Sequence, residues 1–386
     1  MQILTNGRLF DGERLRDDVD VVVADGRIAA IVDAGAGAHD GDVVDLAGHL
    51  LAPGLVDLQI NGGGGVLFND SPDVETLRRI GEAHRAHGTT AFLPTLISDD
   101  NAHMRAAAAA VDAAIAERVP GVLGVHFEGP YLNVARRGAH PAKNIRPLPR
   151  DIERAFPRPA NGVTLVTVAP ECVGLDVIRQ LSRQGVIVFG GHSEATYDEA
   201  RDALDAGMRG FTHLYNAMSP LTAREPGMVG AALEDRQSIV AVIADGIHVH
   251  PAAFAIAVKM KQRGKVLLVT DAMPTVGATT TTFKLGDEYV AVRNGACRTD
   301  DGTLAGAHLG LNDAVRNAIR FAGIDRFEAL RMASTFPAIA VRLDRELGYV
   351  RPGYRASLVE LDKRLNVIRT WVDGDMLTHP LPESAR

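Results

Sequence analysis

The 386-residue sequence predicts an α/β fold: a (β/α)8 TIM-like barrel with a small β-sandwich domain built from both chain termini. From residue 51 onward, short apolar runs alternate with longer segments of helical periodicity, which is typical of parallel strands joined by crossover helices. Such units follow one another over about 250 residues, the usual length of a closed barrel. Strand-like segments also occur at both ends of the chain, and chain ends often lie close together.

Each strand-like end contains a hairpin signal. Residues 19–34, VDVVVADGRIAAIVDA, hold two β-branched runs around Asp25-Gly26, and Asp373-Gly374 stands in the last strand-like stretch. Asp-Gly pairs readily take the positive φ values of a tight turn. We therefore expect residues 1–52 and 347–386 to form the small discontinuous β domain, and residues 53–346 to form the barrel.

The barrel strands are expected at eight apolar runs, with an alanine-rich helix at 101–119 after the second. An open doubly wound sheet is the alternative fold. Against it, the glycine-rich segment 61–65, NGGGG, lacks the G-x-G-x-x-G helix start and the later acidic residue of a dinucleotide site. The expected strands are 55–60, 90–97, 122–127, 163–168, 186–190, 210–214, 238–244 and 265–270.

Composition excludes several classes of protein. The net charge of -7, with scattered basic residues, gives no sign of a nucleic-acid surface. Cys172 and Cys297 are too few for a disulfide framework or a thiolate metal cage. The start has no leader pattern, and no apolar stretch reaches about 18 residues, so no membrane association is expected. We expect a cytoplasmic protein with a small-molecule partner.

Four ionisable side chains stand where expected strands end. Glu128, His192, His213 and Asp271 stand at the ends of the third, fifth, sixth and eighth strands. Barrels of this kind build their active sites at the C-terminal ends of the strands. Any one of these residues alone would more often be a hydrogen-bonded structural group, but their common position favours a shared site.

This set of donors suits metal-assisted hydrolysis. One carboxylate and two imidazoles are good ligands for Zn2+ or a similar divalent ion, with a fourth position left for water. A bound ion lowers the pKa of water from about 15.7 to about 7. Asp271 could then act as general base towards the water and as general acid towards the leaving group.

Six segments, taken in order, resemble a known family: LAPGLVDLQINGGGGVLFND, HFEGPYLN, GGHSEAT, THLYNAMSPLTAREPG, IADGIHV and LVTDAM. They are similar to the N-acetylglucosamine-6-phosphate deacetylase family of the amidohydrolase superfamily. The resemblance runs over nearly the whole chain. It implies a metal-dependent barrel with a small β domain that cleaves the acetamide of N-acetylglucosamine 6-phosphate to glucosamine 6-phosphate and acetate, in amino-sugar catabolism.

The resemblance also implies roles for individual residues. Glu128, His192 and His213 would hold the metal and Asp271 would be the acid/base, as the residues themselves suggest. His140 would lie near the acetamide and donate a hydrogen bond to the developing oxyanion, and the guanidinium of Arg224 would suit the phosphate. The implied substrate-binding residues are Gln59, Asn61, Ala139, His140, Asn216, Ala217, Arg224, Asp245, His248, Leu304, Ala305 and Gly306.

One departure from the wider superfamily bears on the number of metals. Many amidohydrolases carry His-x-His after the first strand, whereas this chain has Gln59-Ile60-Asn61. Amides are poor metal ligands, so one divalent ion per subunit is expected, Zn2+ first, with Fe2+, Mn2+ or Co2+ next. A simpler role for Gln59 and Asn61 is to satisfy hydrogen bonds at the strand end.

The exact substrate and the oligomeric state stay open on sequence alone. The substrate could be another N-acetylated amino sugar phosphate, such as N-acetylgalactosamine 6-phosphate, or the chain could be a non-catalytic scaffold. Family members are typically dimers or larger, so we expect a homodimer or higher homo-oligomer, in which a neighbour could complete the phosphate site. The basic residues of loop 135–150, Arg150 included, could attract an anionic sugar or be solvated charges.

Overall fold

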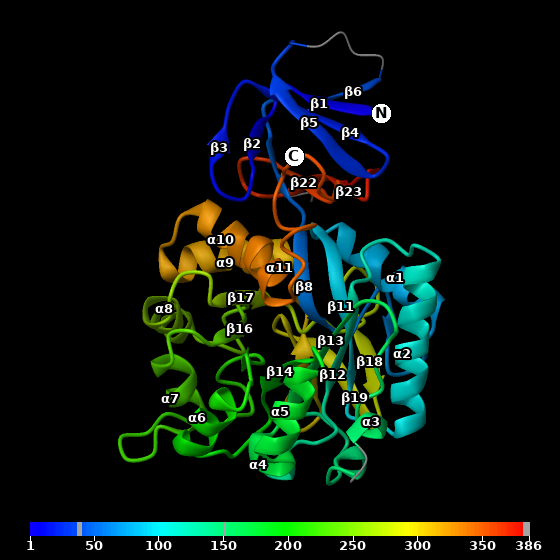
Figure 1. Cartoon of the computed structure of the whole chain (residues 1–386). Coiled ribbons are helices and arrows are strands. Elements are labelled where there is room, and N and C mark those ends of the chain that lie inside the picture. The colour runs from blue at the N-terminus through cyan, green and yellow to red at the C-terminus, as the bar shows by residue number, and fades with distance from the viewer. Residues whose placement is uncertain (37–40, 150–151, 381–386) are drawn as a thin grey trace.

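A barrel of parallel strands forms the centre of the molecule. The computed structural model describes residues 1–36, 41–149 and 152–380, without the side chains of residues 153 and 154. Eight strands follow one another around a single sheet in the order in which they occur in the chain, which confirms the predicted barrel (Figure 1). They are β8 Leu55–Ile60, β11 Thr89–Ile97, β12 Gly124–Glu128, β13 Val163–Val168, β14 Ile187–Gly190, β15 Gly210–Phe211, β16 Ile239–Ile243 and β17 Val266–Val269.

The barrel closes through the residues that follow β17. The Asp271 amide donates to Gln59 O at 3.0 Å, and the Asn61 amide donates to Ala272 O at 2.9 Å. Ile60 and Ala272 form an isolated parallel bridge. The segments that close the barrel therefore carry three of the predicted site residues.

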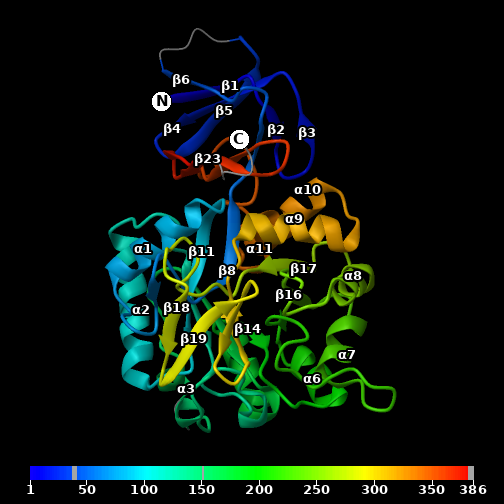
Figure 2. The ribbon, with the colours of Figure 1, turned by 180° about the vertical axis from the view of Figure 1, so that it is seen from behind.

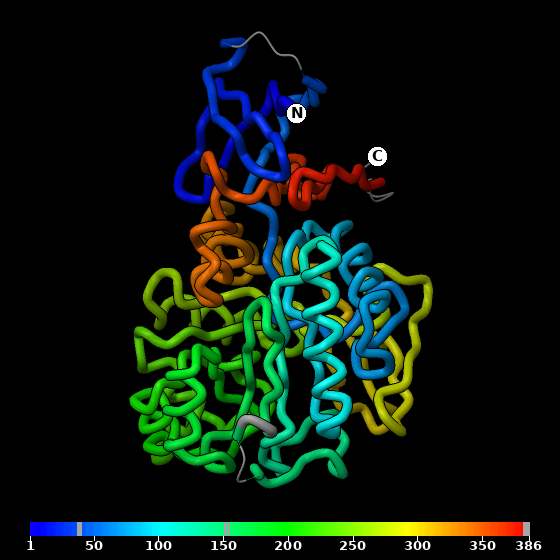
Figure 3. The backbone as a smooth tube through the Cα atoms, turned by 45° about the vertical axis from the view of Figure 1, so that its right-hand side comes forward, coloured from blue at the N-terminus to red at the C-terminus, as the bar shows by residue number. Residues whose placement is uncertain are grey.

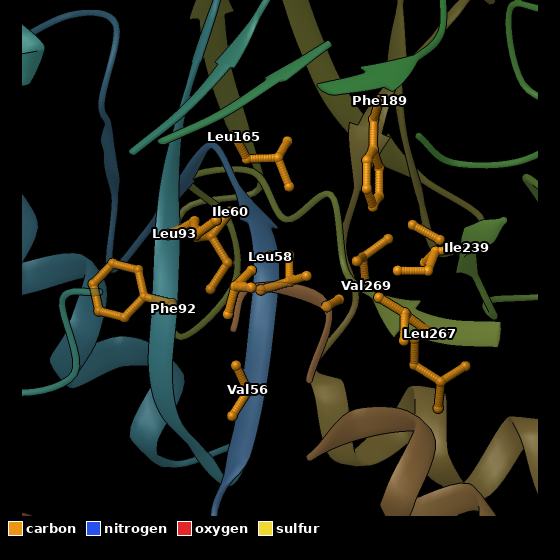
Figure 4. Packing of buried hydrophobic residues seen from close by; sticks show 14 of the residues in the cluster. Val56, Leu58, Ile60, Phe92, Leu93, Leu165, Phe189, Ile239, Leu267 and Val269 are labelled. Atoms are coloured by element: carbon orange, nitrogen blue, oxygen red, sulfur yellow. The ribbon is translucent and has the colours of Figure 1, made fainter. Parts of the chain in front are cut away.

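The barrel interior is filled with branched and aromatic side chains. Figure 4 shows Val56, Leu58 and Ile60 of β8 in the same packed cluster as Leu267 and Val269 of β17. All five are almost inaccessible to solvent. Such a close-packed interior gives the side chains at the strand ends a rigid base.

Helices surround the barrel. The expected alanine-rich helix is present and begins after Asp100, whose carboxylate accepts from the amides of Ala102 and His103, but it ends at Ala116 rather than at 119. The helices are α1 Val74–Arg85, α2 Asn101–Ala116, α3 Ile152–Ala155, α4 Pro170–Val173, α5 Leu175–Arg183, α6 Tyr197–Asp205, α7 Gly227–Glu234, α8 Pro251–Met260, α9 Leu311–Ala322, α10 Arg326–Ala333 and α11 Thr335–Ala340, with short 3-10 turns η1 Val134–Arg136 and η2 Ala142–Asn144.

Both ends of the chain meet in two small sheets beside the barrel (Figure 3). The first has the order β5-β4-β1-β6, and the second, β24-β23-β22-β7-β2-β3, mixes strands from both ends. Both predicted Asp-Gly hairpins are confirmed, because Asp25, Gly26, Asp373 and Gly374 all have positive φ. The predicted division of the chain at 52/53 and 346/347 stays a prediction. The strands are β1 Gln2–Thr5, β2 Arg8–Phe10, β3 Leu15–Arg16, β4 Val19–Ala24, β5 Arg27–Asp33, β6 Asp42–Asp45, β7 Leu50–Pro53, β22 Leu358–Leu361, β23 Val367–Val372 and β24 Asp375–Thr378.

One barrel strand is shorter than the sequence-based expectation, and the glycine-rich segment makes the sharp turn that its composition favours. The sixth strand was expected to reach 214, but β15 ends at Phe211, because His213 takes a φ of +32° that extended backbone does not allow. The glycine-rich segment 61–65 forms a small hairpin, β9 Gly62–Gly63 with β10 Val66–Leu67, whose turn residues Gly64 and Gly65 have positive φ.

A further antiparallel sheet follows β17 and was not expected (Figure 2). The Asn294-Gly295 pair between two of its strands is a hairpin signal that could have revealed it. Its strands are β18 Thr282–Leu285, β19 Glu288–Arg293, β20 Ala296–Thr299 and β21 Leu304–Ala307. No helix in the described part of the chain is long and apolar enough to cross a membrane.

Candidate active site

Glu128, His192 and His213 converge at the C-terminal ends of β12, β14 and β15. Glu128 Oε1 lies 2.9 Å from His213 Nε2 and 3.1 Å from His192 Nε2, and the two Nε2 atoms are 3.1 Å apart. All three side chains are buried. Burial opposes ionisation of Glu128, but the hydrogen bonds from His192 and His213 hold its pKa well below the ordinary value. The carboxylate is therefore charged at neutral pH.

The backbone at this site adopts conformations that L-residues seldom take. His192, His213 and Asp271 have φ of +50°, +32° and +52°, each two residues beyond the end of its strand. A positive φ turns the side chain out of the alternating pattern of the strand, and its cost is borne only where the surrounding structure fixes it. The three residues therefore share a backbone conformation that turns their side chains out of the strand pattern.

Groups outside the cluster hold His192 in place. Its Nδ1 donates to Arg136 O at 2.8 Å, which turns Nε2 towards the cluster. With an ion bound, this Nε2 would present its lone pair as a ligand. The carboxylate of Glu171, on α4, accepts from Ser193 Oγ at 2.7 Å, from the Glu194 amide at 2.8 Å and from Asn133 Nδ2 at 3.0 Å. Glu171 thereby ties the loop that carries His192 to the loop that follows β12.

His140 lies beside this cluster, but its ring nitrogens have different hydrogen-bond partners. Atoms of Glu128, His140 and His192 lie within 4.8 Å of one another, so His140 is also within reach of a shared ion. However, the Ser98 amide donates to His140 Nδ1 at 3.2 Å, and a backbone N–H can only donate. Burial lowers the pKa of His140 to about 3, so the ring is neutral and its proton sits on Nε2. His140 thus presents a hydrogen-bond donor, and His213 is the better third ligand.

The residues fit a single divalent ion. Ligand atoms about 2.0–2.1 Å from a tetrahedral zinc ion lie about 3.3 Å from one another. The distances among Glu128 Oε1, His192 Nε2 and His213 Nε2 are close to this value, and the set of one carboxylate and two imidazoles is typical of catalytic sites with an open position. The predicted metal ligands are therefore brought together by the fold.

Asp271 is buried next to the cluster and receives two amide donors. Asn61 Nδ2 donates to Asp271 Oδ1 at 2.7 Å, and Gln59 Nε2 donates to the same oxygen at 3.1 Å. Gln59 Nε2 also lies 3.3 Å from Glu128 Oε2. Burial, and then the charge of Glu128, raises the pKa of Asp271 to about 6. Two neighbouring carboxylates thus have pKa values pushed in opposite directions, the arrangement expected for separate roles.

These contacts agree with the strand-end role considered for Gln59 and Asn61. Their amide oxygens, Gln59 Oε1 and Asn61 Oδ1, are nevertheless buried without a hydrogen-bond partner among the described residues. Of the two residues, Asn61 lines the cavity, so a ligand hydroxyl or N–H could donate to its Oδ1. The geometry therefore leaves room for a substrate-binding role of Asn61 beside the supporting role.

A cavity of about 420 Å³ opens over the cluster. It has the size of a small-molecule site. Predicted substrate-binding residues that line it are Asn61, Ala139, His140, Asn216, Ala217, His248, Leu304 and Gly306, together with Glu128, His192, His213 and Asp271. The fold thus gathers most of the predicted site around one space.

Four predicted substrate-binding residues do not line this cavity. Gln59 lies behind Asp271, and Ala305 is buried between Leu304 and Gly306. Asp245 accepts from His248 Nδ1 at 2.6 Å, which orients the imidazole. Burial raises the pKa of Asp245, but the hydrogen bond and charge of His248 outweigh it, so the pKa lies below its ordinary value. Arg224 is exposed on the loop before α7 and away from the cavity of its own chain, so its role stays a prediction.

The basic loop 135–150 is largely engaged in local contacts. Arg136 pairs with Glu194, Arg137 donates to His140 O, and Lys143 pairs with Asp287 at 2.9 Å. Arg146 donates to Asp99 O and to Asn101 Oδ1. These contacts favour local structural roles over a general attraction for anions. Arg150 lies outside the described residues.

The β18–β21 sheet forms one wall of the cavity, and sequence reasoning found only its β21 part, through Leu304 and Gly306. Leu285, Arg298, Gly302 and Thr303 come from this sheet, and Met273 packs beside it. None of them stands at the end of a barrel strand, where the predicted metal ligands and Asp271 lie. The hairpin signal at Asn294-Gly295 was the available clue.

Comparison with known proteins gives a consistent result. The model of the amidohydrolase family matches residues 50–377. The N-acetylgalactosamine-6-phosphate deacetylase of Shewanella sp. (strain ANA-3) is 43% identical over 85% of this chain and 83% of its own length. The N-acetylglucosamine-6-phosphate deacetylase of Vibrio furnissii is 34% identical over 98% of this chain and 96% of its own.

The solved structures agree at the level of the whole chain. The crystal structure of N-acetylglucosamine-6-phosphate deacetylase from Pasteurella multocida superposes with a TM-score of 0.93. It is 34% identical and covers 98% of this chain and 100% of its own. The likeness therefore includes the small sheets as well as the barrel.

Proposed function

Because the chain belongs to the amidohydrolase family, we propose that it deacetylates N-acetylglucosamine 6-phosphate, giving glucosamine 6-phosphate and acetate in amino-sugar catabolism. The observation that carries this proposal is the convergence of Glu128, His192 and His213 beside Asp271 at the floor of one cavity. Relatives and a solved structure that share nearly the whole chain are deacetylases of 2-acetamido sugar 6-phosphates.

One divalent ion, Zn2+ first among the candidates, fits the proposal. Glu128, His192 and His213 would hold it, and when bound it would supply Lewis-acid polarisation and lower the pKa of water. Amide side chains at Gln59 and Asn61, where two further imidazoles would suit a second ion, support a count of one. Fe2+, Mn2+ and Co2+ bind similar donor sets, so metal analysis must decide the identity.

The chain's own groups can carry the proton transfers. Asp271, with a pKa raised to about 6, takes a proton from the attacking water and returns one to the amine as the C–N bond breaks. Asn61 and Gln59 hold this carboxylate in place through Oδ1. His140 Nε2–H donates to the acetamide oxygen as negative charge develops on it. The products are an acetate and a free amine, which balances the hydrolysis.

N-acetylgalactosamine 6-phosphate is the second candidate substrate. The relative from Shewanella, at 43% identity, is a deacetylase of this epimer, and the Escherichia coli O157:H7 deacetylase of the same epimer is 37% identical over 97% of this chain. The two sugars differ only in the configuration of one hydroxyl group. Both substrates would use the same metal cluster and the same acid/base.

Steady-state assays test the proposal directly. Acetate release is measured with both 6-phosphorylated epimers and with unphosphorylated N-acetylglucosamine. We expect turnover of the phosphorylated sugars, with the larger kcat/KM identifying the preferred epimer. Absence of acetate release from all three sugars, in protein loaded with zinc, iron or manganese, would instead support a non-catalytic scaffold. The homo-oligomeric state and the cytoplasmic location stay predictions.

A further inference from the structure

Strand β8 carries a buried carboxyl group, that of Asp57, which takes no part in the proposed chemistry. Asp57 is inaccessible to solvent and is not among the described residues that line the cavity. Burial raises its pKa to about 7, although hydrogen bonds from Thr270 and from backbone amides oppose the rise. Burying such a group costs free energy unless hydrogen bonds compensate it, so the contacts of Asp57 show what the group is for.

The carboxyl oxygens of Asp57 connect β8 to the segment that follows β17. Thr270 Oγ1 donates to Asp57 Oδ2 at 2.6 Å, and the amides of Gln59 and Thr270 donate to Oδ1 at 3.1 Å and 3.3 Å. Thr270 is also inaccessible to solvent and immediately precedes Asp271. Asp57 thus joins the strand that carries Gln59 to the strand end that carries the proposed acid/base.

Thr270 extends this connection to the backbone on the far side of Asp271. The Ala272 amide donates to Thr270 Oγ1 at 3.2 Å, and the Asp271 amide donates to Gln59 O at 3.0 Å. The amides of three successive residues, 270 to 272, are therefore all held in this one set of contacts. Asp271 has a φ of +52°, which an L-residue keeps only where its surroundings fix it. The hydrogen bonds on both sides of Asp271 supply that support.

We propose that Asp57 is a positioning residue, which acts through Thr270 to hold Asp271 in the orientation that proton transfer needs. The inference rests on the proposed function, because it concerns the acid/base of that reaction. Gln59 belongs to the same set of contacts, since its backbone amide donates to Asp57 and its side chain donates to Asp271 Oδ1 at 3.1 Å. A misplacement of about 1 Å can cost about a hundredfold in rate, so loss of this support has a kinetic consequence.

Two variants of Thr270 test the assignment, with Thr90→Val as the matched control. Thr270→Val keeps the size of the side chain but removes the hydrogen bonds of its hydroxyl group. We expect kcat for acetate release to fall about 10- to 100-fold, with KM and metal content close to wild type. Thr270→Ser restores the hydroxyl group and should recover most of the activity. Thr90 is buried, and its hydroxyl group donates to Leu55 O at the opposite end of β8, so Thr90→Val should behave as wild type. An equal loss of activity in the control would overturn the inference.

Variants of Asp57 separate positioning from proton transfer. Asp57→Asn keeps an oxygen that can accept from both amides and a nitrogen that can donate to Thr270 Oγ1, so it should retain most of the activity. Asp57→Ala removes these contacts and should lower kcat at least as much as Thr270→Val does. An equal loss in the asparagine and alanine variants would show that the charge or the proton of Asp57 matters, which would overturn the positioning role. If Asp57→Ala does not fold, Thr270→Val alone decides.

Hydrogen exchange of the Asp271 and Ala272 amides gives a readout that needs no turnover. In Thr270→Val the Ala272 amide loses its acceptor, so both amides should exchange about tenfold or more faster than in wild type and in Thr90→Val, as measured by mass spectrometry. Unchanged exchange or wild-type kcat in Thr270→Val would overturn the inference. If wild-type protein hydrolyses neither epimer, the proposed function fails, and faster exchange in Thr270→Val still shows that Asp271 is held in this way.

Discussion

At the scale of single residues, the site gives two buried carboxyl groups, Glu128 and Asp271, different pKa values because their surroundings differ. Hydrogen bonds from the imidazoles of His192 and His213 outweigh the effect of burial on Glu128, so its pKa lies well below the ordinary value. Burial raises the pKa of Asp271, the charge of Glu128 raises it further, and the hydrogen bond from Asn61 opposes the rise, so that the pKa lies at about 6. One carboxylate is therefore suited to a permanent charge and the other to gaining and losing a proton near neutral pH.

Replacing Asp271 by asparagine tests the second of these roles. The side chain keeps its size but loses its ability to accept and return a proton, so kcat should fall about 10²- to 10⁴-fold. Metal content should remain that of the wild type, because the three proposed ligands are untouched. Wild-type turnover in this variant, measured as acetate release, would contradict the acid/base role.

The site residues that could be predicted from sequence lie at the ends of barrel strands, whereas the residues that were missed lie elsewhere. Glu128, His192, His213 and Asp271 could be predicted because each stands at or just beyond the C-terminal end of a recognisable apolar strand. The positive φ values of the last three could not be predicted, because tertiary hydrogen bonds rather than local propensity impose them. Arg298 could not be assigned to the cavity, because the Asn294-Gly295 signal before β20 indicates a hairpin but not which space that hairpin lines.

At the scale of elements, the site depends on contacts between loops. The loop after β14 is held by Glu171 of α4, which also reaches Asn133 in the loop after β12. The Asn133 amide donates in turn to His192 O at 2.9 Å. These hydrogen bonds fix the orientation of His192 relative to Glu128 before any ligand binds.

Replacing Glu171 by glutamine should therefore weaken metal binding. The amide nitrogen cannot accept hydrogen bonds, so part of the support for the His192 loop is lost, and the metal dissociation constant should rise about tenfold or more. Competition with a chromogenic chelator measures this constant. Glu199→Gln is the control, because Glu199 accepts from Thr196 in the capping box at the far end of this loop but forms no hydrogen bond with Ser193, Glu194 or Asn133 among the described residues. An unchanged constant in Glu171→Gln, or an equal rise in the control, would argue against this support.

Helix α1 contributes a pH-dependent contact to the glycine-rich hairpin. His84 Nε2 donates to Gly62 O at 3.0 Å, and burial lowers the pKa of His84 to about 4. The unfolded chain takes up a proton near pH 6.5, whereas the folded chain does so only near pH 4. This histidine therefore lowers the free energy of unfolding as pH falls from about 6.5 to about 4, by about 3 kcal/mol in total.

The variant His84→Gln should remove this component of acid sensitivity. Glutamine can still donate to Gly62 O but takes up no proton. Urea unfolding at about pH 7 and about pH 4.5 gives the free energies of unfolding, and the loss between the two pH values should be smaller in the variant than in the wild type. The same loss in both proteins would show that His84 does not titrate in this way.

A comparison of expected and observed strand boundaries shows which strands the sequence pattern was sufficient to predict. Strands β8 and β13 agree with the expected ranges because their apolar runs are bounded by clear changes of composition. Strand β15 is shorter than expected, because the conformation of His213 interrupts an otherwise strand-like sequence. The β18–β21 sheet was not predicted, since its antiparallel hairpins stand outside the alternation of strands and helices that reveals the barrel.

At the scale of the whole molecule, barrel and small sheets form one architecture. The six-stranded sheet pairs β7, which leads directly into β8, with β22 from the far end of the chain. The fold class could be predicted because the alternation of strands and helices and the strand-like ends extend over most of the sequence. The choice between sugar epimers could not, since it depends on the placement of a few atoms within the cavity.

The central claim is that one divalent ion, held by Glu128, His192 and His213, is required for hydrolysis. The most direct measurement is acetate release from N-acetylglucosamine 6-phosphate and its galacto epimer before and after chelation, with metal content determined on the same samples. We expect about one equivalent of metal per chain, loss of activity with its removal, recovery when a divalent ion is restored, and weak metal retention in Glu128→Ala. Undiminished turnover by metal-free protein, or an unchanged metal content in Glu128→Ala, would contradict it.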